Sequence, residues 1–375
     1  MKVYYLTSSI IPSINANTIN VISMCSALSK NFEKLNFFFS SKDGVTKAEI
    51  KEKFGISLKE NVKLNFIKTT IFHEFLIFLI SLRIFLYDVI VNNKPNLIIC
   101  RNIYGSFFYS LFLKKIVYET HTVEKFFFRK ILQNILLKKK NILTIAITNS
   151  LKNKLIFEYN LVHNKIIILP DGSFDNSKNL INKNYQFKNK FKIGYFGHLY
   201  RGRGIELILN IARKLPNFGF YIVGGDQKSY SNFKKKLLPS NINLLGYKNF
   251  KESKALMRQM DILLCPYQKQ VYLKDQKTNT SSIMSPLKIF EYMSTKRVII
   301  SSNLNVLREV LKNNINCFLA NPRNTQEWVN LITIISKNKN LKNTIAIKAY
   351  LSFKSKYSWD IRVKKLFKFL NEKKI

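Results

Sequence analysis

The sequence lacks the features that mark three common protein classes. Its four cysteines lie far apart and form no CxxC pair, which predicts buried free thiols in a reducing compartment rather than a disulfide framework. Its most apolar stretch, residues 70–91, is interrupted by charged side chains, and the clean run 75–82 is too short to span a bilayer. The opening residues, MKVYYLTSSIIPS, lack the apolar core of a signal peptide. We therefore expect a cytoplasmic protein.

Acidic residues are scarce. The 375-residue chain has 22 Asp and Glu against 62 Lys and Arg, which gives a formal net charge of +40. Such a field favours anionic partners, namely nucleic acid, phosphorylated substrates or anionic lipid. The lysines are spread over the whole chain beside many asparagines, however, so a general Lys/Asn bias in composition explains the charge equally well. Nucleic-acid binding would need clustered basic residues with interleaved aromatics, which the sequence does not show, so no nucleic-acid partner is expected.

Apolar residues, in contrast, are abundant. The chain is 46% hydrophobic and 13% aromatic, which argues against disorder. At 375 residues it is longer than the chain that one hydrophobic core usually serves, and this favours two domains of similar size.

Short apolar runs alternate with helical patterns almost from end to end. In the first half the runs begin with KVYYL (2–6) and end with IIIL (166–169). In the second half they begin with FKIGYFG (191–197) and end with NCFLA (316–320). Continuous apolar strands separated by helices indicate a parallel sheet covered on both faces, here built twice. The sequence thus predicts an α/β fold with two doubly wound, Rossmann-like parallel-sheet domains.

Several boundaries follow from this pattern. We expect a first domain over 1–172, a polar linker over 173–190, a second domain over 191–350 and a helical tail over 351–375. Ligands bind at the carboxyl ends of the strands in such folds, but proteins of several functions share the plan, so the fold alone does not decide the function. The helices predicted in the first domain include 18–31, 104–115 and 149–159, the last with Asn149 as its N-cap.

A glycine-rich loop opens the second domain. Gly197, Gly202 and Gly204 give a loop whose backbone can approach a ligand, and a helix begins near Arg203. The free N–H groups and positive dipole of a helix N-terminus suit phosphate, and Arg201 and Arg203 can engage diphosphate oxygens. The alternative is a glycine turn with solvated arginines.

The stretch SPLKIFEYM places a carboxylate in an apolar helix. Ser285 suits an N-cap and Pro286 the first helical position, which leaves the backbone N–H groups of Leu287 and Lys288 free for an anion. Glu291 lies four residues after Leu287, hence on the same face and one turn deeper. A carboxylate there can accept hydrogen bonds from both hydroxyls of a ribose. The alternative is a surface pair with a nearby lysine.

The second half as a whole resembles a known family. The run FGHLYRGRGIELIL, followed in order by FYIVGG, INLLGY, DILLCPY and SPLKIFEYMSTKRVIISSNLNVLREVL, is similar to the donor-binding domain of GT-B glycosyltransferases of family 4. The first half agrees more weakly, through VYETH, AITNSLKNKL and ILPDG. The resemblance implies two domains that face each other across a cleft, with the last helix crossing back to the first domain.

The resemblance also implies roles for matching residues of the second domain. Arg203 matches the basic residue that holds the donor diphosphate together with a partner. The family often has that partner directly after the first loop glycine, Gly197, but His198 stands there in this chain, so Arg201 is expected to substitute. Glu291 matches the Glu that binds the donor ribose.

Other matches concern the base, the sugar and the first domain. Tyr247 lies where the family contacts the base, and His121 matches the histidine that contacts the transferred sugar near the reacting carbon. For His121 the alternative is a structural histidine at a strand end. Two positions depart from the family pattern: Ile283 replaces a second Glu, and Ala16 and Asn17 stand in for a glycine pair in the loop after the first strand.

The function implied is a hexosyltransferase-like, retaining glycosyltransferase that needs no metal. It would move a sugar from a nucleoside-diphosphate sugar to a hydroxyl of a glycan or lipid-linked acceptor, in cell-surface glycan or polysaccharide biosynthesis. The donor is a co-substrate, and no cofactor is expected. No His/Cys/Asp cluster shows metal-ligand spacing. The alternatives are a non-catalytic two-domain ligand-binding protein and a basic nucleic-acid-binding protein.

Two apolar segments of the first domain, 73–91 and 124–141, suggest a membrane surface as a partner. In the second segment lysines and an arginine surround an apolar helical face, which suits the surface of an anionic membrane. The alternative is an ordinary helix packed on the sheet. We expect peripheral association with the inner face of the cytoplasmic membrane. The apolar residues of this face are Phe126, Phe127, Ile131, Ile135 and Leu136.

Overall fold

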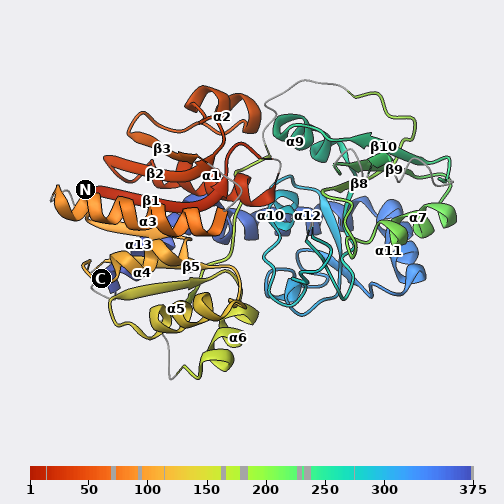
Figure 1. Ribbon diagram of the computed structural model, residues 1–375. Helices are drawn as coiled ribbons and strands as arrows, with labels where there is room; N and C mark the ends of the chain where they lie inside the picture. The colour runs from red at the N-terminus through yellow and green to blue at the C-terminus, as the bar shows by residue number, and fades with distance from the viewer. Residues whose placement is uncertain are drawn as a thin grey trace. The chain divides into compact units, whose positions relative to one another are not determined.

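The structure of the protein is a computed structural model that divides the chain into two units (Figure 1). The first unit contains Met1–Asp171 and Trp359–Ile375, and the second contains Gly172–Ser358. The residues described are 1–13, 15–68, 73–91, 95–113, 115–161, 166–177, 185–225, 230–231, 238–273 and 275–372. Within 73–91, the side chains described are those of 77–79 and 81–91.

The first unit is built on a seven-stranded parallel sheet of order β3-β2-β1-β4-β5-β6-β7. The strand predictions from the apolar runs are confirmed, although β1 extends four residues beyond the run 2–6. The strands are β1 (Lys2–Ile10), β2 (Lys34–Ser41), β3 (Val62–Lys68), β4 (Leu97–Cys100), β5 (Ile116–Thr120), β6 (Ile142–Ala146) and β7 (Ile166–Ile168).

Helices cover both faces of this sheet. Side chains of α3, α4 and α5, including Phe85, Tyr109 and Leu136, share one core cluster on one face, and α13 packs against α1. The helices of the unit are α1 (Ala16–Leu28), α2 (Lys47–Phe54), α3 (His73–Ile90), α4 (Ile103–Tyr109), α5 (Phe127–Lys138), α6 (Asn149–Tyr159) and α13 (Trp359–Glu372).

Three local predictions in the first unit were wrong in detail. The helix α4 ends at Tyr109, well before the predicted residue 115. The N-cap of α6 is Thr148, whose hydroxyl accepts a hydrogen bond from the Leu151 N–H, so Asn149 is already the first helical residue. The helix α1 begins at Ala16, so Ala16 and the following asparagine belong to a helical turn rather than to a loop.

The second unit repeats the design with a six-stranded parallel sheet of order β10-β9-β8-β11-β12-β13. The predicted fold class, two doubly wound parallel-sheet domains, is therefore confirmed. The strands are β8 (Lys192–Phe196), β9 (Gly219–Val223), β10 (Ile242–Gly246), β11 (Ile262–Cys265), β12 (Val298–Ser302) and β13 (Phe318–Ala320). The helices are α7 (Ile205–Lys214), α9 (Phe250–Gln259), α10 (Leu287–Met293), α11 (Thr325–Lys337) and α12 (Lys339–Lys356).

The continuous apolar strands of this unit have a direct physical reason. Neighbouring residues of one strand point to opposite faces of the sheet, and here each face carries its own core. Ile300 of β12 packs into the cluster that contains Trp328, whereas Ile299 packs into the cluster that contains Tyr292. The four cysteines are buried and free, as their spacing predicted.

Within the described residues, no helix combines the length and the apolar content that crossing a lipid bilayer requires. The longest apolar candidate, α3, packs its inward side on the sheet of the first unit.

A buried arginine attaches the helix α13 to the rest of the first unit. The guanidinium of Arg362 donates to the carbonyl oxygens of Pro170 (2.9 Å) and Leu169 (3.3 Å), and it forms an ion pair with Glu119 at 3.0 Å. Both charged side chains are almost completely buried. The C-terminal helix is thus held by charge as well as by apolar packing.

We predict that Arg362→Met lowers the free energy of unfolding by about 3–5 kcal/mol, because it leaves a buried carboxylate without its closest cation. Urea unfolding followed by circular dichroism measures the loss. Lys364→Met, at an exposed position of the same helix, is the matched control and should change little. A loss no larger than that of the control would show that the ion pair does not hold the helix.

Candidate active site

The glycine loop of the second unit connects β8 to α7. Gly202 and Gly204 have φ angles of +83° and +81°, and a Cβ on them would lie 1.9 Å from the Gln270 carbonyl oxygen and 1.8 Å from that of Pro266. Both positions therefore require glycine, because the loop lies directly on the segment that follows β11. Gly204 is also the N-cap of α7, so the helix starts at the end of this loop.

The two arginines of the loop point to different neighbours. The guanidinium of Arg203 lies 5.1 Å from the ring centroid of Tyr267, and its buried Nε has no hydrogen-bond partner among the described residues. Arg201 is exposed and stacks over the Tyr272 ring at 4.9 Å. The structure therefore brings Arg203, but not Arg201, to the buried part of the loop.

Lys288 is the second cation at this place. Its ammonium lies 3.8 Å from the ring centroid of Tyr195 and 5.1 Å from that of Tyr267, and it has no hydrogen-bond partner among the described residues. A Cβ on Gly197 would meet its Nζ at 2.9 Å, so the ammonium lies directly against the start of the glycine loop. Burial, helped by the nearby Arg203 charge, lowers the Lys288 pKa to about 7.

The sequence had suggested Lys288 for its backbone N–H group, not for its side chain. The start of the helix was also predicted one residue too early: Pro286 is the N-cap, α10 begins at Leu287, and Ser285 lies outside the helix. The signal that could have identified the side chain is a lysine within the apolar sequence LKIF, where an ammonium without a partner is costly.

Glu291 lies one turn after Leu287 on α10. Burial raises its pKa, while the positive charges of Lys254 and Lys288 act in the opposite direction. Burial also disfavours the charged form of Lys254 and lowers its pKa to about 8. Among the described residues no cation lies within ion-pair distance of the Glu291 carboxylate, so the surface pair considered as an alternative is not formed.

Three further positions singled out in the second unit have surroundings of their own. The His198 ring stacks on Tyr200 with centroids 4.7 Å apart, and the His198 carbonyl accepts a hydrogen bond from the Tyr195 hydroxyl at 2.6 Å. Tyr247 follows β10 and is exposed, whereas Ile283 is buried. The residues that the structure brings together are therefore Gly197, Arg203, Lys288 and Glu291.

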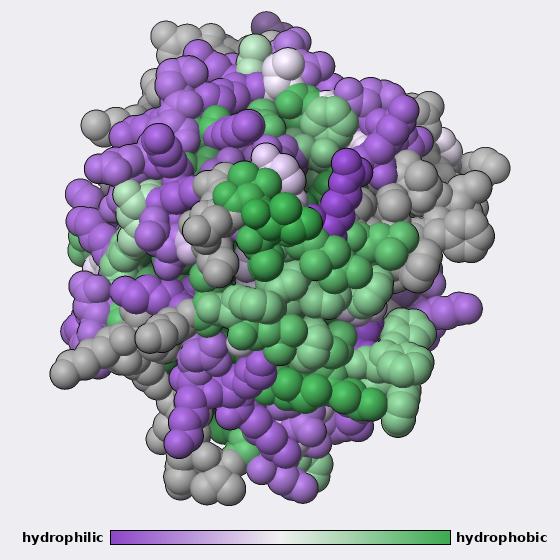
Figure 2. Space-filling model, turned by 60° about the vertical axis from the view of Figure 1, so that its left-hand side comes forward, coloured by the Kyte–Doolittle hydropathy of each residue, from purple (hydrophilic) through white to green (hydrophobic). Residues whose placement is uncertain are grey.

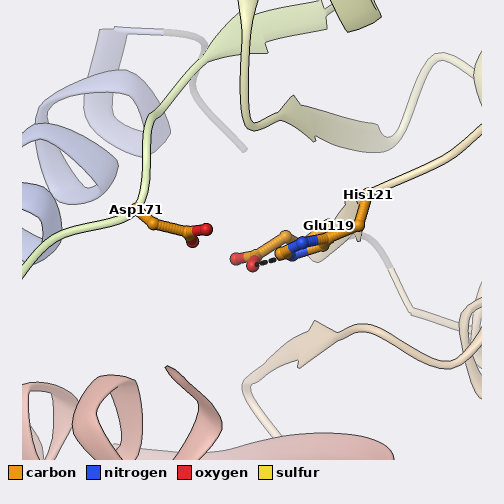
Figure 3. Close-up of side chains that lie close together, drawn as sticks. All are labelled: Glu119, His121 and Asp171. Atoms are coloured by element: carbon orange, nitrogen blue, oxygen red, sulfur yellow. Dashed lines mark hydrogen bonds and ion pairs between the residues drawn. The ribbon is translucent and has the colours of Figure 1, made fainter. Parts of the chain in front are cut away.

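A second polar group lies at the carboxyl end of β5 in the first unit. His121 follows the strand, and its Nε2 lies 2.8 Å from Oε1 of Glu119 (Figure 3). Its Nδ1 lies 3.5 Å from Nη2 of Arg101. The imidazole is half-buried, and Glu119 is completely buried. The ring is thus held between a carboxylate and a guanidinium.

The charge of Glu119 is maintained by its surroundings. Burial by itself would raise its pKa, but the ion pair with Arg362, the hydrogen bond from His121 and the Arg101 charge hold the pKa well below its usual range. Glu119 is therefore a permanent carboxylate that fixes the orientation of the imidazole.

Asp171 completes a group of three possible metal ligands. Its carboxylate faces the other two side chains, and ligand atoms of Glu119, His121 and Asp171 lie within 4.8 Å of one another (Figure 3). One histidine and two carboxylates can bind a divalent cation. Two guanidinium groups, however, lie within 4 Å of Glu119, at 3.0 Å and 3.7 Å, and would repel such an ion. The arrangement fits the support of an imidazole better than a metal centre.

The start of α1 is connected to the same group. Arg101 donates from Nη2 to the side-chain oxygen of Asn17 at 2.9 Å, and Asn17 donates to the Ser9 hydroxyl at 2.7 Å. Ala16 is the exposed first residue of the helix. Arg101, Glu119 and Arg362 had no predicted role, although a charge at the end of an apolar strand, as in LIICR and IVYE, is a usable signal.

Comparison with known proteins agrees with this architecture. Residues 176–352 match the family described as "Glycosyl transferases group 1". An uncharacterized glycosyltransferase of Methanocaldococcus jannaschii is 24% identical over 247 residues, which cover 61% of this chain and 66% of that protein. The chain therefore spans slightly less than two thirds of the length of this relative.

Solved structures match over nearly the whole chain. Sucrose-phosphate synthase from Thermosynechococcus elongatus has a TM-score of 0.75 at 11% identity, with 99% of each chain covered. HepE from Anabaena, in complex with UDP-glucose, has a TM-score of 0.70 at 14% identity and covers 99% of this chain and 100% of its own. The chain therefore has the GT-B fold of these glycosyltransferase structures, and its residues 176–352 match the model of the glycosyl transferases group 1 family.

Proposed function

We propose that this protein is a glycosyltransferase that moves a sugar from a nucleoside-diphosphate sugar to a hydroxyl group. The observation that carries the proposal is the group at Gly197, where the buried ammonium of Lys288 has no hydrogen-bond partner among the described residues. An ammonium held in that state is unfavourable unless an anion joins it. The match to the glycosyl transferases group 1 family supports the proposal, and it favours neither the binding-protein nor the nucleic-acid alternative.

The donor-binding roles follow from the charges. Lys288 and Arg203 would bind the diphosphate, since a phosphate oxygen supplies the acceptor that the Lys288 ammonium and the Arg203 Nε lack among the described residues. Glu291 would accept hydrogen bonds from the ribose hydroxyls, and Tyr247 would contact the base. That HepE forms a complex with UDP-glucose supports a nucleotide-sugar donor.

The proposed chemistry is transfer with retention and without a metal. The acceptor oxygen bonds to the anomeric carbon as the bond from that carbon to the diphosphate oxygen breaks, and the hydroxyl proton passes to a phosphate oxygen. Lys288 and Arg203 would stabilise the negative charge that develops on the leaving diphosphate. His121, oriented by Glu119, would hydrogen-bond to the transferred sugar. We propose a glycan or lipid-linked acceptor of cell-surface glycan synthesis.

A screen of nucleotide sugars tests the function directly. UDP-, GDP- and ADP-sugars are added separately, and both the thermal shift and the release of nucleoside diphosphate are measured. A transferase should bind one class selectively and release its nucleoside diphosphate slowly by hydrolysis. Binding without release would favour the non-catalytic alternative, and a shift with random DNA alone would favour the nucleic-acid alternative.

We predict that Glu291→Gln weakens nucleoside-diphosphate binding by about 1.5–3 kcal/mol, the range for a charge-assisted hydrogen bond. Stability should not fall, because the carboxylate has no ion pair to lose. Isothermal titration calorimetry measures the affinity, with Glu252→Gln on α9 as the control. Unchanged affinity would remove Glu291 from the site.

Lys288 should make stability depend on pH. Its pKa is about 7 in the folded chain against an ordinary value of 10.5, so the unfolded chain binds more protons between these values and stability rises with pH across that window. We predict that Lys288→Met is more stable than the wild type by about 2–4 kcal/mol below pH 7 and loses this advantage toward pH 10. Urea unfolding at several pH values measures the difference.

The control for this prediction is Lys348→Met, at an exposed position of α12. Its stability relative to the wild type should be nearly constant with pH. A pH-independent difference for Lys288→Met would mean that the ammonium is not buried as described. In Lys288→Met, nucleoside-diphosphate affinity should also fall at least about tenfold at pH 6.5, since a charge-assisted hydrogen bond to the diphosphate is lost.

We predict that His121→Ala lowers sugar transfer at least about tenfold and leaves nucleoside-diphosphate affinity nearly unchanged, as expected of a residue that contacts the sugar and not the nucleotide. Steady-state kinetics and calorimetry separate the two effects. Glu119→Gln should also lower transfer, because the His121 imidazole is then held less firmly in its orientation. If His121→Ala instead lowers stability and affinity together, the histidine is structural.

A further inference from the structure

The helix α3 differs from an ordinary surface helix because its exposed side is apolar as well as its buried side. A helix that covers a sheet normally turns apolar residues inward and polar residues to solvent. In α3 the polar side chains of Ser81 and Asp88 are buried, while an apolar stripe at helical spacing faces outward, with Ile90 80% exposed. Among the described side chains of α3, the exposed apolar residues are Leu79, Leu86, Tyr87 and Ile90.

Hydrogen bonds hold this orientation in place. The Asp88 carboxylate accepts a hydrogen bond from the Tyr4 hydroxyl at 2.9 Å and another from the Tyr109 hydroxyl at 2.5 Å. Rotating α3 to bury its apolar stripe would break both bonds and expose Phe85, which packs in the core of the sheet face. The outward stripe is therefore a fixed feature of the first unit.

The apolar surface continues over the neighbouring helices. Leu111 and Phe112 protrude after α4, and the Phe112 ring packs on Phe85 of α3 with centroids 5.0 Å apart. Figure 2 shows apolar side chains gathered over this side of the first unit. We call this surface the apolar face. It consists of the exposed residues of α3 named above, of Leu111 and Phe112, and of the exposed apolar residues of α5 and its N-cap, which are Phe126, Phe127, Phe128, Ile131 and Ile135.

The helix α5 adds a second stripe. Phe126, Phe127 and Phe128 are each more than 70% exposed, and Ile131 and Ile135 follow along the helix. This agrees with the apolar face predicted for 124–141 except at Leu136, which is completely buried in the core shared with α3 and α4.

The charges next to the α3 and α4 part of the apolar face are positive. Arg83 lies exposed within the α3 stripe, Lys115 is exposed just before β5, and Lys139 donates from Nζ to the Ser110 hydroxyl beside Leu111. Among the described residues of 77–91 and 95–118, Asp88 is the sole acidic side chain, and it is buried.

We propose that the apolar face docks on the surface of an anionic phospholipid bilayer. Moving large exposed apolar side chains from water into the boundary between headgroups and acyl chains lowers the free energy. The flanking cations bind lipid phosphates. A second copy that met the α3 and α4 part of the face is a poorer occupant, because it would bring the same cations together with no exposed acid among the described residues of 77–91 and 95–118 to oppose them. The site needs no sugar donor, so its test is independent of the proposed transfer activity.

The test is co-sedimentation of the full chain with vesicles of phosphatidylglycerol and phosphatidylcholine, against phosphatidylcholine alone. Leu86→Ser combined with Ile90→Ser removes two exposed residues four apart on α3. Ile347→Ser combined with Leu351→Ser removes two equally spaced exposed residues of α12 in the second unit and is the matched control. Phe127→Ser combined with Ile131→Ser tests the α5 stripe separately.

We expect the wild type and the control to bind anionic vesicles, less so in high salt, and the α3 and α5 variants to partition at least tenfold more weakly. Thermal melts verify that each variant is folded. Equal binding to neutral vesicles, no binding at all, or variants that bind like the wild type would overturn the proposal. A wild-type dimer in light scattering that the α3 variant converts to a monomer would assign the face to a second copy instead.

Discussion

The buried carboxylate of Glu119 is the charge on which the first unit depends. It lies on an interior strand, and three partners reach it from different parts of the chain: the guanidinium groups of Arg101 after β4 and Arg362 from α13, and the imidazole of His121 after β5. A buried carboxylate is tolerated only when it is paired, so the position of the imidazole and the attachment of the last helix follow from one electrostatic requirement.

In the second unit the buried charges are unpaired rather than paired. Lys288 and Glu291 lie on one helix, both are desolvated, and neither has a hydrogen-bond or ion-pair partner among the described residues. Paired charges of the first kind stabilise the fold and orient a side chain. Charges left unpaired weaken the fold, and a ligand that supplied the missing partner would relieve this cost. The apolar face of the first unit is a third case, in which apolar side chains rather than charges lack a partner.

Sequence patterns predicted the elements better than their ends. Every apolar run predicted as a strand became one. The helix α4, however, is shorter than its pattern, the N-cap of α6 is Thr148 rather than Asn149, and α10 starts one residue later than predicted. Periodicity depends on many residues and tolerates errors, whereas a helix end depends on the conformation of a single residue. The odd charge of Glu291 was visible in the sequence because its neighbours are apolar.

The sequence by itself determined the two-sheet plan, since a strand buried on both faces must be apolar throughout, and it determined the glycine loop and the helix that carries Glu291. Only the tertiary structure decided which side chains meet. It placed the Lys288 ammonium against Gly197, whereas the Arg201 side chain is exposed. It also placed Arg362 from the last helix against Glu119 and left an apolar stripe of α3 exposed. These contacts join residues far apart in sequence, and their partners depend on strand order and helix rotation, which local patterns do not encode.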